Sequence, residues 1–211
     1  MTPIGLALLG VFVGAVLNAL ADDLPHRLNP QPPHCPACGQ PHHPLQWVAI
    51  IAFLGGRGRC AYCGTPLPMR RLLVEVASAL MLVFLFQKFG ATLKFGLLAV
   101  LLESLLLITV IDLEHRLILY VTIFPTAGAA LLYALFGGEQ ELLPALTKSL
   151  FGGLAGFAVF YLLYLFSFGF ARLVERLRGE ALTEVPFGGG DVNLAGVVGL
   201  AVGWPGILLT I

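Results

Sequence analysis

Six apolar segments dominate this sequence and decide what kind of protein it can be. Each is close to the length of about 17 to 25 residues that an α-helix needs to cross a bilayer. They are Ile4–Leu20, Leu72–Gln87, Phe95–Ile111, Leu117–Phe136, Ala145–Phe170 and Val192–Ile211. Hydrophobic residues make up 58% of the 211 residues and charged residues only 11%, too little charge for the surface of a water-soluble domain. We therefore expect an all-α polytopic membrane protein with about six transmembrane helices.

Two features of these segments need comment. Pro125 and Pro205 lie inside the fourth and sixth segments, where we expect kinks, because a membrane helix tolerates proline when its neighbours satisfy the freed backbone groups. Ala19-Leu20-Ala21 resembles the cleavage site of a secretory signal peptide, but no basic residues precede the first segment. We therefore keep that segment as a helix.

The basic residues predict the orientation in the membrane. Nine lie in alternate connections and three in the others, and the richer set marks the cytoplasmic side. The nine are Arg27, Arg57, Arg59, Arg70, Arg71, Arg116, Arg172, Arg176 and Arg178; the three are Lys88, Lys94 and Lys148. The N-terminus is then outside. The net charge is zero, which gives no indication of nucleic-acid binding.

A polar insert between the first two apolar segments contains all four cysteines. They form two CxxC pairs, Cys35 with Cys38 and Cys60 with Cys63, each followed at once by a glycine. Two such pairs separated by 21 residues are typical of a structural zinc site with four thiolate ligands. A cytoplasmic insert would keep the thiols reduced, which disfavours disulfides. A redox CxxC pair or unrelated free thiols are the alternatives.

Other residues of the insert have more ordinary interpretations. His34, His42 and His43 could replace a cysteine ligand, but with four thiolates available they are expected to be loop histidines. The segment Trp47–Leu54 is too short to span a membrane, so it is either a short strand or a helix lying at the interface.

Four acidic residues lie within or beside the apolar segments, where charge is costly and marks function. Glu75 could form an ion pair with Arg70-Arg71 or support the site. Glu103 lies deeper. Asp112 follows it by nine residues, on the opposite side of one helix and about 14 Å away, so the two cannot form a dyad. Glu103 is expected to make an interhelical hydrogen bond.

Asp112 and Asp191 are expected at the same, cytoplasmic face. Asp112 lies at the end of the third segment, and Asp191 follows Gly188-Gly189-Gly190 at the start of the sixth. Glycines permit close approach of another backbone, such as an extended peptide, to the carboxylate; a plain glycine linker is the alternative. Two adjacent carboxylates can share one proton, so that one deprotonates water and the other donates to a scissile carbonyl. This is the chemistry of peptide hydrolysis without a covalent intermediate.

Several motifs together resemble the type IV prepilin peptidases, which belong to the GxGD class of intramembrane aspartyl proteases. These are the double CxxC insert after the first helix, VIDLEHRLI around Asp112, and GGGDVNL at Gly188–Leu194. Leu17-Asn18, Leu24-Pro25, Arg57-Gly58-Arg59-Cys60 and Val74-Glu75 also follow the order of the family. The resemblance covers nearly the whole chain.

The resemblance implies Asp112 and Asp191 as the catalytic dyad of an aspartic-type endopeptidase in the bacterial inner membrane. The substrate would be a prepilin or pseudopilin, cleaved at the cytoplasmic face to remove its leader. Many members then methylate the new N-terminal residue with S-adenosylmethionine, although no residue of this chain by itself indicates a site for that cofactor. Relatives usually continue beyond the position of Ile211.

The sequence departs from the family pattern at three places. An arginine often precedes the Leu-Pro that here reads Asp22-Asp23-Leu24-Pro25, and Pro-Asp often stands where this chain has Leu119-Tyr120. Lysine is usual at Asn193. The aspartates are retained, so these departures weaken the methyltransferase assignment more than the peptidase assignment.

The sequence predicts three parts: a first transmembrane helix at 1–21, a zinc-binding insert at 22–71 and a membrane protease domain at 72–211. A transporter or channel that uses Glu103, Asp112 and Asp191 as a proton or cation path is the main alternative. A non-catalytic scaffold organised by the zinc insert is the second. Membrane lipid is the other expected partner besides the substrate, and the sequence does not determine the oligomeric state.

Overall fold

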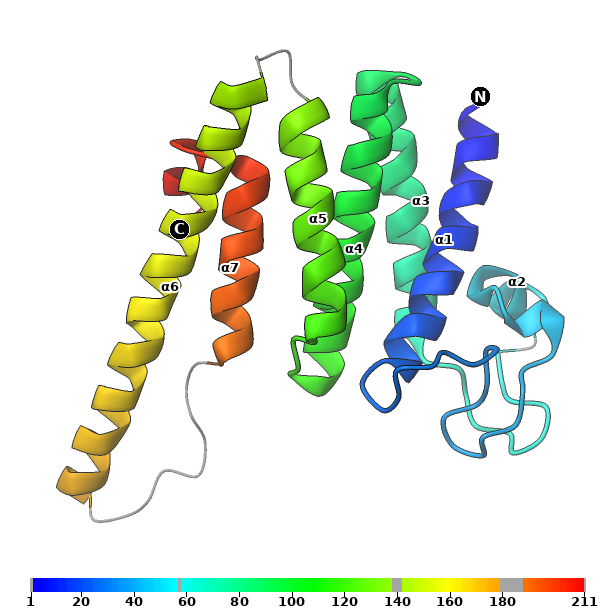
Figure 1. Cartoon of the computed structure of the whole chain (residues 1–211). Helices are drawn as coiled ribbons and strands as arrows, with labels where there is room; N and C mark the ends of the chain where they lie inside the picture. The colour runs from blue at the N-terminus through cyan, green and yellow to red at the C-terminus, as the bar shows by residue number, and fades with distance from the viewer. Residues whose placement is uncertain (1, 57, 138–141, 179–187, 211) are drawn as a thin grey trace. The chain divides into compact units, whose positions relative to one another are not determined.

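The protein is described here by a computed structural model covering residues 2–56, 58–137, 142–178 and 188–210, with the backbone alone described for 173–178. The chain divides into two compact units, Met1–Leu117 and Ile118–Ile211. The first contains α1 (Pro3–Asp23), the 3-10 turn η1 (Pro44–Gln46), α2 (Ala49–Leu54), α3 (Met69–Phe89) and α4 (Leu93–His115). The second contains α5 (Tyr120–Phe136), α6 (Leu142–Arg178), α7 (Gly189–Val202) and the 3-10 turn η2 (Gly206–Leu209) (Figure 1).

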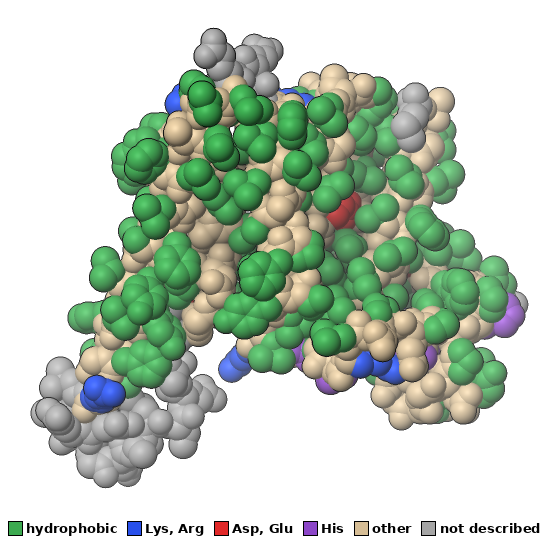
Figure 2. All heavy atoms as spheres, viewed as in Figure 1, with side chains coloured by type: hydrophobic (Ala, Val, Ile, Leu, Met, Phe, Trp, Pro, Cys, Tyr) green, Lys and Arg blue, Asp and Glu red, His purple; other side chains and the backbone are tan. Residues whose placement is uncertain are grey.

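Four described helices are long and apolar enough to cross a membrane. They are α1, α3, α4 and the part of α6 from Leu142 to Arg172. Helices α5 and α7 are apolar but shorter, with 17 and 14 residues. Hydrophobic side chains cover most of the helical surface visible in Figure 2, as expected for helices that face lipid. The predicted all-helical membrane fold is confirmed, and the number of six spans stays a prediction.

In the first unit, helices α1 and α3 pack so closely that their backbones are in contact. Gly10 and Gly14 are four residues apart and therefore lie on one face of α1. A Cβ added to Gly14 would come within 2.6 Å of the Cα of Glu75, and one at Gly10 would collide with the backbone of Ala79. Small residues at this spacing allow van der Waals packing in a membrane, where the hydrophobic effect cannot hold helices together.

Close packing through small residues also joins α6 and α7 in the second unit. Gly152 and Gly156 on α6 face Gly199 and Ala195 on α7. A Cβ at Gly156 would lie 2.5 Å from the carbonyl oxygen of Ala195, and one at Gly152 would lie 2.5 Å from that of Gly199. Helix α5 packs beside both, so α7, which carries Asp191, is held on two sides.

Two predicted boundaries were wrong. The sixth apolar segment does not form one helix to Ile211, because α7 ends at Val202, Gly203 adopts a φ of 71° and Pro205 follows. In the other direction, α6 continues past Phe170 to Arg178, so Arg172, Arg176 and Arg178 lie on a helix rather than in a loop. The run ARLVERLR is made of residues with good helix propensity, which accounts for the extension.

Candidate active site and metal centre

The insert between α1 and α3 folds as two knuckles with the same hydrogen bonds. The amides of Cys35 and Cys60 each donate to the carbonyl oxygen five residues later, at 2.9 and 2.8 Å. The amides of Gly39 and Gly64 donate back to the carbonyl oxygens of Cys35 and Cys60, at 2.8 and 3.0 Å. Both glycines have a positive φ, 69° and 73°, which explains why a glycine follows each CxxC pair.

The knuckles bring the four thiols together. All four sulfurs lie within 4.8 Å of one another. Cys35 Sγ is 3.7 Å from Cys63 Sγ, and Cys38 Sγ is 3.8 Å from Cys60 Sγ, so each of these pairs joins one knuckle to the other. A tetrahedral zinc ion about 2.3 Å from each sulfur would separate the sulfurs by about 3.8 Å. The predicted cluster of Cys35, Cys38, Cys60 and Cys63 is therefore confirmed as a group that can hold a metal ion.

The surroundings of the sulfurs favour the thiolate form in one knuckle. The Thr65 hydroxyl, 3.1 Å from Cys63 Sγ, and the Thr65 backbone lower the pKa of the Cys63 thiol to about 6. Backbone contacts with Cys63 and Tyr62 lower the pKa of Cys60 as well. A metal ion needs deprotonated thiols, so this half of the cluster suits metal binding at neutral pH.

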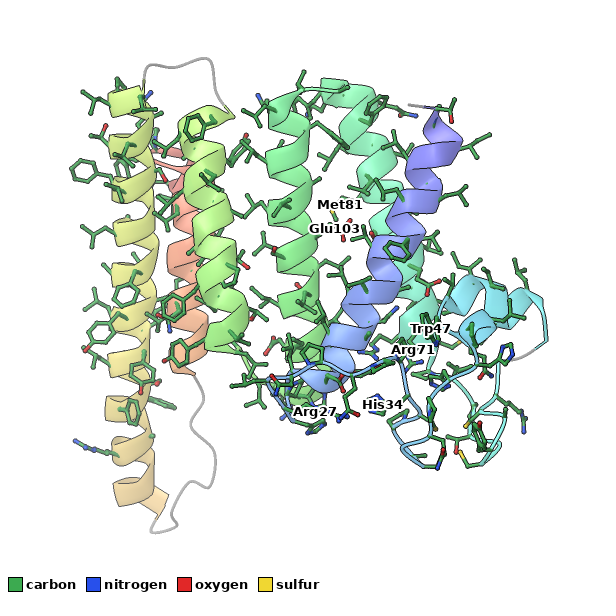
Figure 3. All side chains as sticks on the ribbon, turned by 45° about the vertical axis from the view of Figure 1, so that its right-hand side comes forward. Arg27, His34, Trp47, Arg71, Met81 and Glu103 are labelled. Carbon is green, nitrogen blue, oxygen red and sulfur yellow. The ribbon has the colours of Figure 1, made fainter. Side chains whose placement is uncertain are left out.

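His34, His42 and His43, the histidines near the CxxC pairs, are not part of this cluster. His34 Nε2 lies 3.0 Å from an Arg27 nitrogen, and Figure 3 shows these two side chains near each other below α1. His43 Nδ1 accepts a hydrogen bond of 3.3 Å from the Leu45 amide. His42 is buried beside Cys35 and Cys60, and this burial lowers its pKa, which keeps the ring neutral.

Ion pairs join the ends of α1, α3 and α4 beside the insert, and sequence reasoning missed these pairs. Asp22 at the end of α1 binds Arg70 and Arg71 at the start of α3, the latter at 2.6 Å. Arg70 Nη1 also lies 2.9 Å from Glu114 Oε2 on α4. This places the insert and the Asp112 end of α4 at the same end of the first unit. The buried Asp23 accepts from Arg27 Nε at 3.1 Å; the i, i+4 spacing of this pair was a usable signal.

Glu75 has a different partner from the one expected. Instead of an ion pair with Arg70-Arg71, its two carboxylate oxygens accept hydrogen bonds from the amides of Ala49 (2.6 Å) and Ile50 (2.9 Å). These amides are unpaired donors at the first turn of α2, where a carboxylate is favourable. Glu75 therefore attaches α2 to α3. The segment Trp47–Leu54 contains this helix, so the helical alternative for it is confirmed and the strand is excluded.

Glu103 makes the interhelical hydrogen bond that was predicted. Its Oε1 lies 2.7 Å from the hydroxyl of Ser78 on α3, and that hydroxyl lies 2.8 Å from the carbonyl oxygen of Gly10 on α1. Glu103 is buried, and Figure 3 shows it beside Met81, between α3 and α4. This contact joins all three long helices of the first unit.

Asp112 lies in the last turn of α4. Its carbonyl oxygen accepts from the amide of Arg116, which ends the helix in the left-handed conformation with a φ of 52°. The side chain is partly exposed, and no donor in the described part of the chain is bonded to its carboxylate. The carboxylate is thus accessible at the end of an apolar helix.

Asp191 occupies the first turn of α7, as predicted. Its Oδ2 accepts a hydrogen bond of 3.1 Å from the Gly188 amide. Together with the positive end of the α7 helix dipole, this contact stabilises a negative charge on Asp191. Asp112 belongs to the first unit and Asp191 to the second, so their pairing stays a prediction.

The three glycines before Asp191 do not share one role. A Cβ at Gly189 would meet no atom within 4 Å, whereas a Cβ at Gly190 would lie 2.7 Å from the Cβ of Ile118. A Cβ at Gly188 would lie 3.4 Å from Asp191 Oδ2 and 3.9 Å from the Gly190 amide nitrogen, both ordinary contacts. Gly190 is thus required for packing within the second unit. Open space for an approaching backbone remains at Gly188 and Gly189.

A cavity of about 200 Å³ borders Asp191 within the second unit. Its lining is almost entirely apolar and comes from α6, α7 and the end of the chain. The lining residues are Gly156, Phe160, Asp191, Leu194, Ala195, Val198, Ile207 and Thr210. Asp191 is the only ionisable group among them, so an apolar group in this cavity would lie beside a carboxylate.

Curated proteins with similar sequences share one description. The chain is 29% identical to a prepilin leader peptidase/N-methyltransferase of Pseudomonas aeruginosa, in an alignment that covers 97% of this chain and 74% of that protein. It is 28% identical to one of Myxococcus xanthus (96% and 57%) and 32% identical to one of Burkholderia pseudomallei (87% and 55%). The chain thus spans little more than half the length of the last two. No solved structure matches it.

Two family matches cover most of the chain. Residues 8–89, which include the four cysteines, match the bacterial peptidase A24 N-terminal domain. Residues 99–211, which include Asp112 and Asp191, match the type IV leader peptidase family over more than half of the chain. On this basis the chain belongs to the type IV leader peptidase family.

Proposed function

We propose that this protein is a prepilin leader peptidase, which removes the leader of a prepilin or pseudopilin at the cytoplasmic face of the bacterial inner membrane. The family match across both aspartates is the observation that carries the proposal. The names of the relatives support the substrate class. The transporter alternative has no such support, and Glu103, the deepest acidic residue of its supposed path, is engaged with Ser78.

In the proposed mechanism Asp112 and Asp191 form the dyad. Asp191 is the base, because the Gly188 amide and the helix N-terminus stabilise its ionised form. It removes a proton from water, and the resulting hydroxide attacks the scissile carbonyl carbon. Asp112, in the last turn of α4, is the acid and donates its proton to the carbonyl oxygen. The tetrahedral intermediate then breaks as Asp191 passes the proton it took from water to the leaving amine, and Asp112 takes back its proton as the carbonyl group forms again.

The dyad is tested by cleavage of a prepilin by the purified protein in lipid. We expect Asp112→Asn and Asp191→Asn each to reduce the rate by a factor of about 10² to 10⁴, because each removes an acid–base group. Glu114→Gln is the matched control, since it makes the same change two residues from Asp112 in a side chain bound to Arg70. The control should retain cleavage within tenfold. Normal cleavage by either aspartate variant would contradict the dyad.

We also infer that the four cysteines hold one structural zinc ion. The sulfur separations match tetrahedral thiolate coordination. The ion would supply a crosslink between the two knuckles.

A second activity, methylation of the new N-terminus with S-adenosylmethionine, is favoured by the names of the relatives. The expected result is a mass increase of the mature pilin by one methyl group when the protein, prepilin and S-adenosylmethionine are incubated together. The measurement is mass spectrometry of the cleaved product. Asp191→Asn with a substrate that has already been cleaved is the control, because a separate methylation site should survive the loss of hydrolysis. Cleaved product without any mass increase would refute this activity.

A further inference from the structure

The segment from η1 to α2 presents a large apolar face on one side of the insert. Its exposed side chains are Leu45, Trp47, Ile51 and Leu54, with exposed fractions of 43, 47, 49 and 86%. The run Pro44–Gly56 contains no Asp, Glu, Lys or Arg. Figure 2 shows hydrophobic side chains gathered over α2. In water, a face of this kind would be an aggregation liability.

The opposite face of α2 is made of small residues. Ala49 and Ala52 are buried, with exposed fractions of 1 and 0%. Because alanine has a short side chain, α2 can lie close to α3, with which it is in contact (Figure 1). The helix is therefore amphipathic in an unusual sense: small residues face the protein and large apolar residues face outward.

The hydrogen bonds that Glu75 accepts fix the position of α2 along the axis of α3. Glu75 is six residues after Met69, the first residue of α3, which is about 9 Å along the helix axis. It holds the amides of Ala49 and Ile50 at that level. Leu73 and Val76, on either side of Glu75 in α3, are 66 and 40% exposed and belong to the apolar surface of a membrane-spanning helix. The apolar face of α2 thus lies at the level of exposed apolar side chains on a helix that is long and apolar enough to cross a membrane.

We propose that η1 and α2 form an anchor that inserts its apolar face into the headgroup and upper acyl region of the bilayer, holding the cysteine insert against the membrane. The occupant is phospholipid rather than a protein partner. Interfacial helices bury their apolar side by about 5–10 Å. Trp47 suits this depth, because tryptophan prefers the interface, and its indole nitrogen already donates to the His42 carbonyl oxygen at 3.1 Å.

Trp47 is also the probe that tests the proposal. The chain has two tryptophans, so Trp204→Phe leaves Trp47 as the only one. The full chain is reconstituted in particles whose phospholipids carry bromine either near the carbonyl end or near the methyl end of the acyl chains. We expect stronger fluorescence quenching by the shallow bromine, and weak quenching by aqueous iodide. Trp47→Phe, which leaves Trp204, gives the background for the same lipids.

A charged variant of the anchor distinguishes contact with lipid from other causes of Trp47 shielding. Ile51→Glu with Leu54→Glu should lower quenching by the shallow bromine about twofold and raise quenching by iodide, because the face no longer favours the bilayer. Leu28→Glu with Asn29→Glu is the matched control, since both side chains are exposed and lie outside the anchor and outside the cysteine pairs. Iodide quenching without bromine quenching would overturn the proposal. It would also be overturned if Trp47 became shielded only when two chains share a particle, because a second copy would then be the occupant.

Discussion

At the scale of single residues, the Ser78 hydroxyl has two acceptor oxygens within reach but only one hydrogen to donate. Its hydroxyl lies within hydrogen-bond distance of both the Gly10 carbonyl oxygen and Glu103 Oε1. A serine hydroxyl carries one hydrogen, so both contacts are hydrogen bonds only if Glu103 is protonated and donates to Ser78 while Ser78 donates to Gly10. Protonation also removes a charge from the interior of three membrane helices.

Substitutions at this contact separate a neutral Glu103 from an ionised one. Glu103→Gln should change the free energy of unfolding by less than about 1 kcal/mol, because an amide can donate in the same way. Ser78→Ala should lower it by about 1–3 kcal/mol, because it leaves the buried carboxyl group without its partner. The measurement is reversible unfolding in mixed detergent. If Glu103→Gln were as destabilising as Ser78→Ala, Glu103 could not be the donor.

Single residues also show where sequence reasoning reaches its limit. The interhelical bond of Glu103 was predictable, since a buried carboxyl group in a membrane helix needs a partner. The partner of Glu75 was not predictable, because its bonds to Ala49 and Ile50 join positions about 25 residues apart in sequence. The basic neighbours Arg70 and Arg71 suggested an ion pair, but Asp22 binds both of them.

At the scale of elements, the cysteine knuckles were the most predictable part of the fold. Each knuckle is closed by hydrogen bonds within six residues, and its glycine takes the one conformation that other residues avoid. Spacing alone therefore sufficed to predict the cluster of four cysteines. Helix ends were less predictable, because α6 continued past its apolar segment and α7 stopped inside one.

Metal analysis of the purified protein tests the zinc site that the two knuckles are proposed to form. The purified protein should contain about one zinc ion per chain, and Cys35→Ser with Cys60→Ser should abolish it, because one ligand is lost from each knuckle. His43→Ala is the control and should retain the ion, since this ring bonds the Leu45 amide. Zinc should also be released as the pH falls, because protons compete for the thiolates. Wild-type protein without zinc would refute the assignment.

At the scale of the whole molecule, the all-helical membrane fold was predictable from apolar length and composition. The division at Leu117 and Ile118 was not, because it depends on which helices pack together rather than on where polarity changes. Each unit carries one aspartate of the proposed dyad, Asp112 at the end of α4 and Asp191 at the start of α7. The proposed hydrolysis therefore needs both units.

The glycines that join α1 to α3 and α6 to α7 have a consequence for how this sequence can vary. Gly10, Gly14, Gly152 and Gly199 perform no chemistry, yet any other amino acid at these positions adds at least one carbon where a neighbouring backbone already lies. There is no conservative replacement for them, whereas the exposed leucines of the same helices can be exchanged for other apolar residues. We therefore expect sequence divergence to be slowest at these glycines of the two helix contacts, and as slow there as at the two aspartates.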